Sequence, residues 1–418
     1  GCYNVDVTNT AFVSAIYGEG DFTIIYGSVE GISQRFIQIK NSRCEIRFEA
    51  NNVVVQGPWN YVWTYKTEYM RIKKFIGDKL TMLVHMQNSA GEDNGDGQPA
   101  DLTMWVDYVY RGYTYFPYPS GNLTSGYRPL IALDASDAIR QKTVNINIKS
   151  VYLYDVAIHV LCNAWATGIT RNVENWTFNL NIDYLQHDLN DADQAFQTVA
   201  GGIIAPITGN LPAYSRKNTH QNFTIKEAVV DHSLVSMRTQ APTNAASTNN
   251  SITFNIDYAI RRRMVLTGGT INNLGARSMF TLPYLPWLAP DVIAGERVHV
   301  FYNVKRAIAK EGNMFGEFSW HETHGTLWPW YAGNTIISGS YITEDGSPVM
   351  ELNGKGEACV LKDAIFIAKG AATNSIVVNN GSATVKIYTK DFLTNLGFGA
   401  GLTQDGNYTI DATILNYY

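Results

Sequence analysis

The stretch from Gly77 to Tyr113 constrains the fold of this chain most, because it reads as two strands joined by a polar loop. Leu80–Met86 is apolar and nearly continuous, and Leu102–Tyr110 is rich in aromatic and branched residues. Glycines and a proline, which are typical of loops, are spread over Gln87–Asp101 between them. The stretch therefore predicts consecutive strands and no intervening helix.

The rest of the chain also favours strands. Val144, Ile146 and Ile148 alternate with polar residues, which is the pattern of a half-buried strand. Similar runs occur at 22–26, 252–258, 298–302, 365–367 and 385–388. The best helix candidate is Asp188–Ala200, with Asp188 as its N-cap. The pattern predicts an all-β protein.

Two segments of the sequence are alike. Asn175–Tyr184 and Ser251–Tyr258 both contain Thr-Phe-Asn and Ile-Asp-Tyr. The match either arises by chance or marks equivalent strands in two related sandwiches. A Gly- and Pro-rich boundary at 201–222 favours a division into a sandwich at 1–120, a β-rich continuation at 121–210 and a second, projecting β-rich domain at 211–418.

The charge of the chain argues against a protein that wraps nucleic acid. The net charge is −5, and no Lys/Arg-rich arm precedes the first strand. The four cysteines fit no metal or redox spacing, which favours thiols over two long-range disulfides. No apolar run is long enough to span a membrane. The first residue, Gly1, is either a processing site of a precursor or a late start.

The order of strands resembles that of a known family of shell proteins. Asp21–Val29, Arg43–Val55 and Lys79–Tyr113 follow one another as an early strand, a second strand and a closing pair. Met279–Trp287 looks like an aromatic–proline corner. This pattern resembles the capsid proteins of picorna-like viruses of the insect and invertebrate type, which have positive-strand RNA genomes. The resemblance implies antiparallel jelly-roll β-sandwiches.

The same resemblance implies a function. It predicts a structural capsid protein, not an enzyme, that self-assembles into an icosahedral virion around an RNA genome. Its partners would be other capsid subunits, the viral RNA and a host receptor, and assembly would take place in the host cytoplasm. The alternative is a secreted β-rich binding protein, either a glycan-binding module or a pore-forming toxin. An upstream polyprotein sequence or a signal peptide would distinguish the two.

Two clusters are candidate contact sites. Arg261, Arg262 and Arg263 are adjacent, and guanidinium groups bind phosphates or acidic groups of a neighbouring subunit. Alternation along a strand would, however, turn the middle arginine away from the others. The aromatic residues Trp328, Trp330 and Tyr331 indicate either core or a surface that anchors a partner.

Other motifs lack the spacing that their chemistry needs. His321 and His324 are three residues apart in a β-rich context, where they would face opposite sides. Glu92–Gly97 lacks the ligand positions of a calcium loop. No Gly-x-Ser-x-Gly elbow is present. The sequence thus predicts no catalytic residue, no metal ligand and no cofactor.

Overall fold

The computed structural model describes the strands of the chain and several of the turns between them. The described residues are 3–4, 7–8, 15–16, 22–32, 37–39, 46–55, 62–63, 68–77, 83–86, 102–112, 130–134, 143–154, 162–165, 173–188, 202–206, 216–235, 248–264, 278–282, 298–317, 329–331, 335–352, 355–370, 376–379, 382–387, 392–395, 397–398 and 402–404.

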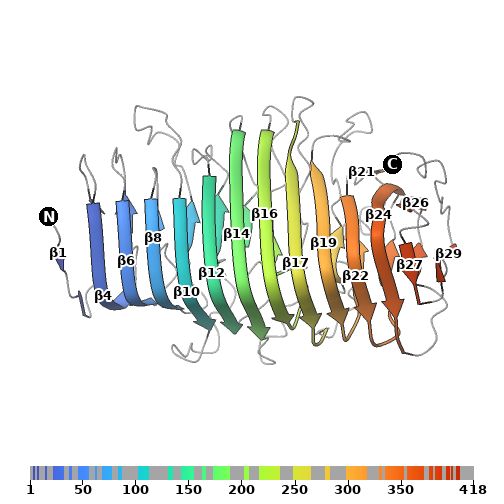
Figure 1. The fold of residues 1–418 in the computed structure, drawn as a ribbon, viewed down its shortest axis with the longest axis horizontal. Coiled ribbons are helices and arrows are strands. Elements are labelled where there is room, and N and C mark those ends of the chain that lie inside the picture. Colours follow the sequence, from blue (N-terminus) through green and yellow to red (C-terminus); the bar gives the residue numbers. More distant parts are fainter. Residues whose placement is uncertain are drawn as a thin grey trace, which may run out of the picture.

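Long strands form one continuous sheet in chain order (Figure 1). They are β4 (Phe22–Ile32), β6 (Ile46–Val55), β8 (Glu68–Gly77), β10 (Leu102–Gly112), β12 (Thr143–Tyr154), β14 (Val173–Asp188), β16 (Arg216–Val230), β17 (Ser251–Arg261), β19 (His299–Ala309), β22 (Thr335–Thr343), β24 (Lys355–Ala368) and β26 (Ser382–Ile387). Each pairs in parallel with the next.

Short strands alternate with the long ones and form a second parallel layer. They are β9 (Val84–Met86), β11 (Ile131–Asp134), β13 (Cys162–Trp165), β15 (Ile204–Ala205), β18 (Ser278–Leu282), β20 (Asn313–Glu317), β23 (Met350–Leu352), β25 (Val377–Asn379) and β29 (Leu402–Gln404). Bridges from Val235 to Ile204 and to Phe280 join the two halves of this layer. The chain therefore winds between two sheets, one coil per long strand, which is the architecture of a β-solenoid.

The antiparallel jelly roll predicted from the sequence is wrong. Nine successive long strands, from β8 to β24, form an all-parallel sheet. Among the described residues, the one antiparallel pairing joins β27 (Phe392–Thr394) to β28 (Gly397–Phe398). Alternation of apolar and polar residues indicates a strand with one buried face, and parallel strands meet that condition when a second sheet covers the face. The pattern alone therefore did not determine strand direction.

The long strands from β8 to β19 bury their side chains with the same interruption. In β12, Val144, Ile146 and Ile148 point into the core, and after two outward residues Val151 and Leu153 point inward again. The same break follows the equivalent residue of the neighbouring strands, since Ile148 pairs with Ile182 in β14 and with Val106 in β10. In each of these strands the break places two adjacent side chains on the outer face.

The core consists of aromatic and aliphatic side chains stacked from coil to coil. The rings of Phe223 and Phe254 lie 5.1 Å apart, as do those of Phe254 and Tyr302, and both pairs are stacked. Tyr302 also donates a hydrogen bond to the carbonyl oxygen of Thr281, 2.7 Å away. Burial raises the pKa of the Tyr302 hydroxyl, so it stays a neutral donor.

The duplicated Ile-Asp-Tyr motif belongs to one stack and not to two sandwiches. Ile182 pairs with Ile225, which pairs with Ile256, so the motif occupies the same position two coils apart. The predicted boundary at 201–222 falls between β14 and β16, which pair in one sheet. The division into domains stays a prediction.

Several strand predictions are confirmed, and others lie outside the described residues. The runs at 144–148, 252–258, 298–302 and 365–367 fall on β12, β17, β19 and β24. Asp188 ends β14 and does not begin an observed helix, while 189–200, the predicted helix, lies outside the described residues. Cys359 is buried in the core as a thiol.

Candidate functional site

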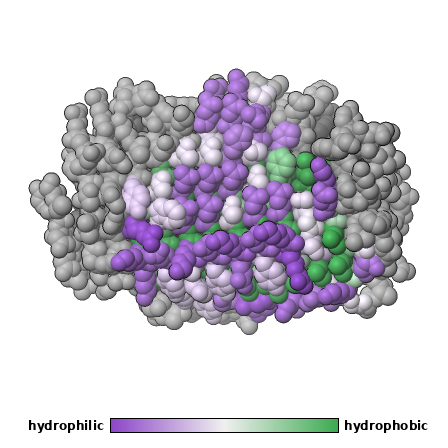
Figure 2. Space-filling model, in the orientation of Figure 1, coloured by the Kyte–Doolittle hydropathy of each residue, from purple (hydrophilic) through white to green (hydrophobic). Residues whose placement is uncertain are grey.

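The outer face of the long sheet presents equivalent polar side chains in rows across the coils (Figure 2). In the first rows, asparagines hydrogen bond to one another. Asn179 donates its amide to Asn145 at 2.7 Å, and Asn222 donates to Asn179 at 2.8 Å. Asn181 donates to Asn147 at 3.0 Å. Each amide in such a ladder keeps further hydrogen-bonding capacity for a group above the face.

Another row, the charged row, carries charges that alternate in sign from coil to coil. Each member is the first of the two adjacent outward residues of its strand. The members are equivalent because the residues before and after them pair in register with those of the next strand. Lys226 lies 2.7 Å from Asp183, and Lys305 lies 2.7 Å from Asp257. In chain order the row reads Lys73, Asp107, Lys149, Asp183, Lys226, Asp257 and Lys305.

Aromatic side chains lie beside the charged row at its N-terminal end. The ring of Tyr152 lies 5.3 Å from that of Tyr108 and 5.7 Å from that of Tyr184. Lys74 approaches the Tyr108 ring to 6.0 Å. Trp105, from the same strand as Tyr108, is 42% exposed. These rings offer flat apolar area on a face that is otherwise polar.

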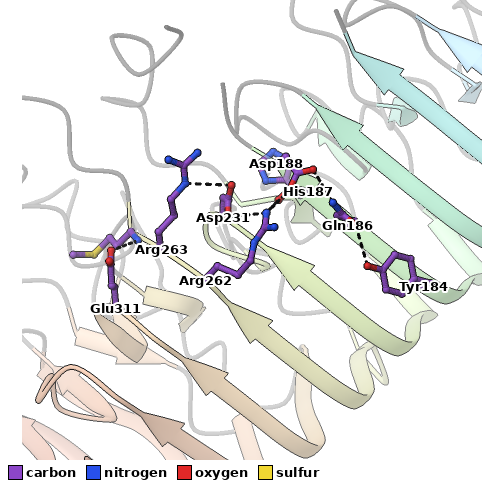
Figure 3. Close-up of polar contacts among 9 residues, drawn as sticks. Tyr184, Gln186, His187, Asp188, Asp231, Arg262, Arg263 and Glu311 are labelled. Atoms are coloured by element: carbon purple, nitrogen blue, oxygen red, sulfur yellow. Dashed lines mark hydrogen bonds and ion pairs between the residues drawn. The ribbon is translucent and has the colours of Figure 1, made fainter. Parts of the chain in front are cut away.

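A cluster of charged residues closes the ends of β14, β16 and β17 (Figure 3). Arg262 bridges the carboxylates of Asp188 and Asp231, and Arg263 lies 3.2 Å from Asp231. Gln186 donates to Asp188 at 2.7 Å and accepts from the Tyr184 hydroxyl at 3.0 Å. The carboxylates and guanidinium groups neutralise one another, so the cluster ties three successive coils together.

The three adjacent arginines do not form one patch. Arg261 is fully buried, and its guanidinium group donates to the carbonyl oxygens of Glu311 and Asn313. Burial lowers its pKa to about 10, which leaves it a cation at neutral pH. Arg262 and Arg263 reach the surface in the cluster described above. Their predicted contact with RNA or a neighbouring subunit stays a prediction.

The predicted aromatic contact site falls largely outside the described residues. Trp328 lies outside them, and Trp330 and Tyr331 belong to β21 (Pro329–Tyr331), which pairs with β24. The motifs at 92–97 and 321–324 also lie outside the described residues. Sequence reasoning missed the charged row, although its alternation becomes visible once the strands are aligned on the break in their apolar pattern.

A buried histidine lies near Arg261 behind the cluster. The Nδ1 atom of His232 accepts a hydrogen bond from the backbone N–H of Ser233 at 2.5 Å, so this nitrogen is unprotonated. Burial, His187 and Arg261 together lower the pKa of His232 to about 3. The folded protein therefore holds His232 as the neutral imidazole.

This histidine should make the protein less stable in mild acid. The unfolded chain takes up a proton near pH 6.5 and the folded chain only near pH 3, so stability falls as pH drops through this window. Between pH 7 and pH 5 the contribution is about 2 kcal/mol. Urea unfolding at both pH values should show a smaller loss for His232→Gln than for the wild type. His220→Gln, on the outer face, is the control and should keep the wild-type loss; equal losses in all three proteins would contradict the assignment.

The fold and its outer face place the protein in the class of parallel β-solenoids, here with a polar outer face that carries charges of alternating sign. Comparison of the chain with known proteins found no relative. No family model matches the chain, and no curated protein or solved structure matches it either. Among the described residues, no group of His, Cys, Asp and Glu has the arrangement of a metal site. No helix in that part of the chain has the length and hydrophobicity of a transmembrane span.

Proposed function

We propose that the protein is a structural subunit that assembles with copies of itself, and that the assembly is the shell of an RNA virus. The observation that carries the proposal is the outer face of the long sheet. It combines hydrogen-bonding amides, tyrosines and charges of both signs, which is a composition suited to wet protein–protein contacts. The viral setting comes from the sequence resemblance to picorna-like capsid proteins alone, because the jelly-roll strand order that it implied is contradicted by the parallel sheet.

The strand-end cluster supports a structural role more than a catalytic one. A general acid–base pair needs two carboxyl groups whose environments differ, so that one holds a proton and the other does not. Asp188 and Asp231 instead share the same cation, Arg262. Asp231 is further held by Arg263. Both carboxylates are thereby engaged in ion pairs within the chain.

Sedimentation velocity and negative-stain electron microscopy of the native material test this proposal. Closed particles of uniform diameter are expected, because a shell subunit associates at micromolar concentration without an added ligand. Monomers at all concentrations and salt conditions would contradict it.

Exposed aromatic residues favour a second candidate, a glycan-binding protein. Trp105 is exposed on the same face of β10 as Tyr108, and such rings stack on the apolar faces of sugars. A glycan array would then show binding that Trp105→Ala abolishes. Thr103→Ala, a change on the same face of β10, serves as the control and should leave binding intact.

A further inference from the structure

The charged row of the outer face is complementary to itself when its direction is reversed. Six of its members, from Asp107 to Lys305, begin with an aspartate and end with a lysine, and their signs alternate in between; Lys73 of β8 precedes them. A second row laid over it in the same direction would oppose each charge with its like. When a second row is laid over it in the opposite direction about the midpoint between Asp183 and Lys226, these six charges each face a counterion, and Lys73 faces the uncharged coil of β22.

We infer that two copies of this chain pack with the outer faces of their long sheets together, related by a two-fold axis parallel to the strands. This inference rests on the proposed self-assembly and names its geometry. The rotation reverses the order of the coils and keeps each row opposite itself, which makes the contact isologous. The charged contacts are then Asp107 with Lys305, Lys149 with Asp257, and Asp183 with Lys226, each formed twice.

The charged side chains in the middle and at the C-terminal end of the row are accessible, whereas Asp107 is 38% exposed and accepts hydrogen bonds from Arg71 at 2.7 and 2.9 Å. Among the carboxylates, the exposed fractions of Asp183 and Asp257 are 50% and 51%. Those of Lys226 and Lys305 are 65% and 77%. Their ion pairs within the chain lie at the surface, where such pairs contribute little and leave each charge able to bind a second partner.

The row next to the charges is complementary under the same rotation. It contains Tyr108, Tyr184, Glu227 and Arg306, at the second outward position of the break. Reversal places Arg306 of one copy over the Tyr108 ring of the other, a cation–π arrangement. It also places the Tyr184 hydroxyl opposite the Glu227 carboxylate, a donor opposite an acceptor.

The asparagine row that contains Asn145, Asn179 and Asn222 fits the same arrangement. Asn179 of one copy comes to lie opposite Asn222 of the other, because the two occupy adjacent coils at the centre of the row. Each amide can both donate and accept across the contact. Three rows of the outer face are thus self-complementary under a single symmetry operation.

The face is large enough for a stable dimer. The coils that carry the charged row, spaced at about 4.8 Å, and a strand length of about ten residues give a contact of roughly 30 Å by 30 Å. This corresponds to about 900 Å² per copy, compared with about 800 Å² per partner in a typical stable interface.

Charge swaps at the ends of the row test the geometry at constant net charge. The variant Asp257→Lys/Lys305→Asp keeps an ion pair within the chain but creates like-charge contacts with Asp107 and Lys149 of the second copy. We expect dimer affinity, measured by sedimentation equilibrium, to fall about 10- to 100-fold. Adding Asp107→Lys/Lys149→Asp restores opposite charges across the contact and should return the affinity to near the wild-type value.

The fourfold variant separates the interface from the fold. Within one chain it places like charges next to each other at three junctions of the row, one of them with Lys73, and removes the Arg71–Asp107 ion pair, whereas the twofold variant creates one such junction. Damage to the fold would therefore grow from the twofold to the fourfold variant, and association would not recover. Circular dichroism and urea unfolding of each variant report the fold independently.

The outcomes distinguish this inference from the proposed function. Assembly of the wild type that the twofold swap leaves unchanged would overturn the face-to-face geometry and leave self-assembly standing. Loss of association in the twofold variant without recovery in the fourfold variant would also overturn the geometry. A wild type that never associates, or that associates only around a glycan, would overturn both.

Discussion

Replacing Phe254 with alanine is expected to lower the free energy of unfolding by about 3–5 kcal/mol. Phe254 is fully buried at the centre of the aromatic stack, with rings of Phe223 and Tyr302 each 5.1 Å away. Removal of its ring leaves a cavity between two coils, and the stacked backbones on either side prevent the cavity from closing. In a solenoid each coil contacts mainly its neighbours, so the loss interrupts the stack near its middle.

Urea unfolding of two control variants checks this explanation. Phe254→Leu retains much of the volume and should cost clearly less than the alanine variant. Thr253→Ala, on the outer face of the same strand, should change stability by no more than about 0.5 kcal/mol. If Phe254→Ala costs no more than Thr253→Ala, Phe254 does not lie between two packed coils.

Replacing Gly339 with alanine is expected to cost about 2–4 kcal/mol. Gly339 has a φ of 104°, a conformation that L side chains rarely adopt. A Cβ atom at this position would lie 1.7 Å from the carbonyl oxygen of Val304. The register between β19 and β22 shifts at this point, so the glycine allows two coils to pair across an irregularity.

The neighbouring residue provides the control for this variant. Ser340→Ala leaves a Cβ atom where one already exists and should cost less than about 1 kcal/mol. Thermal unfolding of both variants measures the difference, with a larger drop in Tm for Gly339→Ala. Equal Tm values would show that the backbone at Gly339 does not approach Val304 closely.

Much of the strand content could be predicted from the sequence, because the alternation of apolar residues depends only on local geometry. The run from Ile252 to Tyr258 is half-buried whichever way its neighbours point. Direction depends on the connections, and these vary in length, so no fixed period marks the coils. The Ile-Asp-Tyr match at 182–184 and 256–258 was one sequence feature that reflected the stacking of equivalent strands.

The candidate site could not be predicted, because it depends on register. Lys149 and Asp183 become neighbours only when Ile148 is paired with Ile182. The break in the apolar pattern, with two outward residues between Ile148 and Val151, was present in the sequence and could have aligned the strands. The burial of Arg261, by contrast, has no signal in the local sequence, because it depends on carbonyl groups from a later coil.

Cryo-electron microscopy of the assembled native material tests the central claim most directly. We expect stacked parallel strands, with the outer faces of two long sheets in contact and Asp183 of one copy beside Lys226 of the other. A map that shows antiparallel sandwiches, or solenoids whose outer faces touch only solvent, would contradict it.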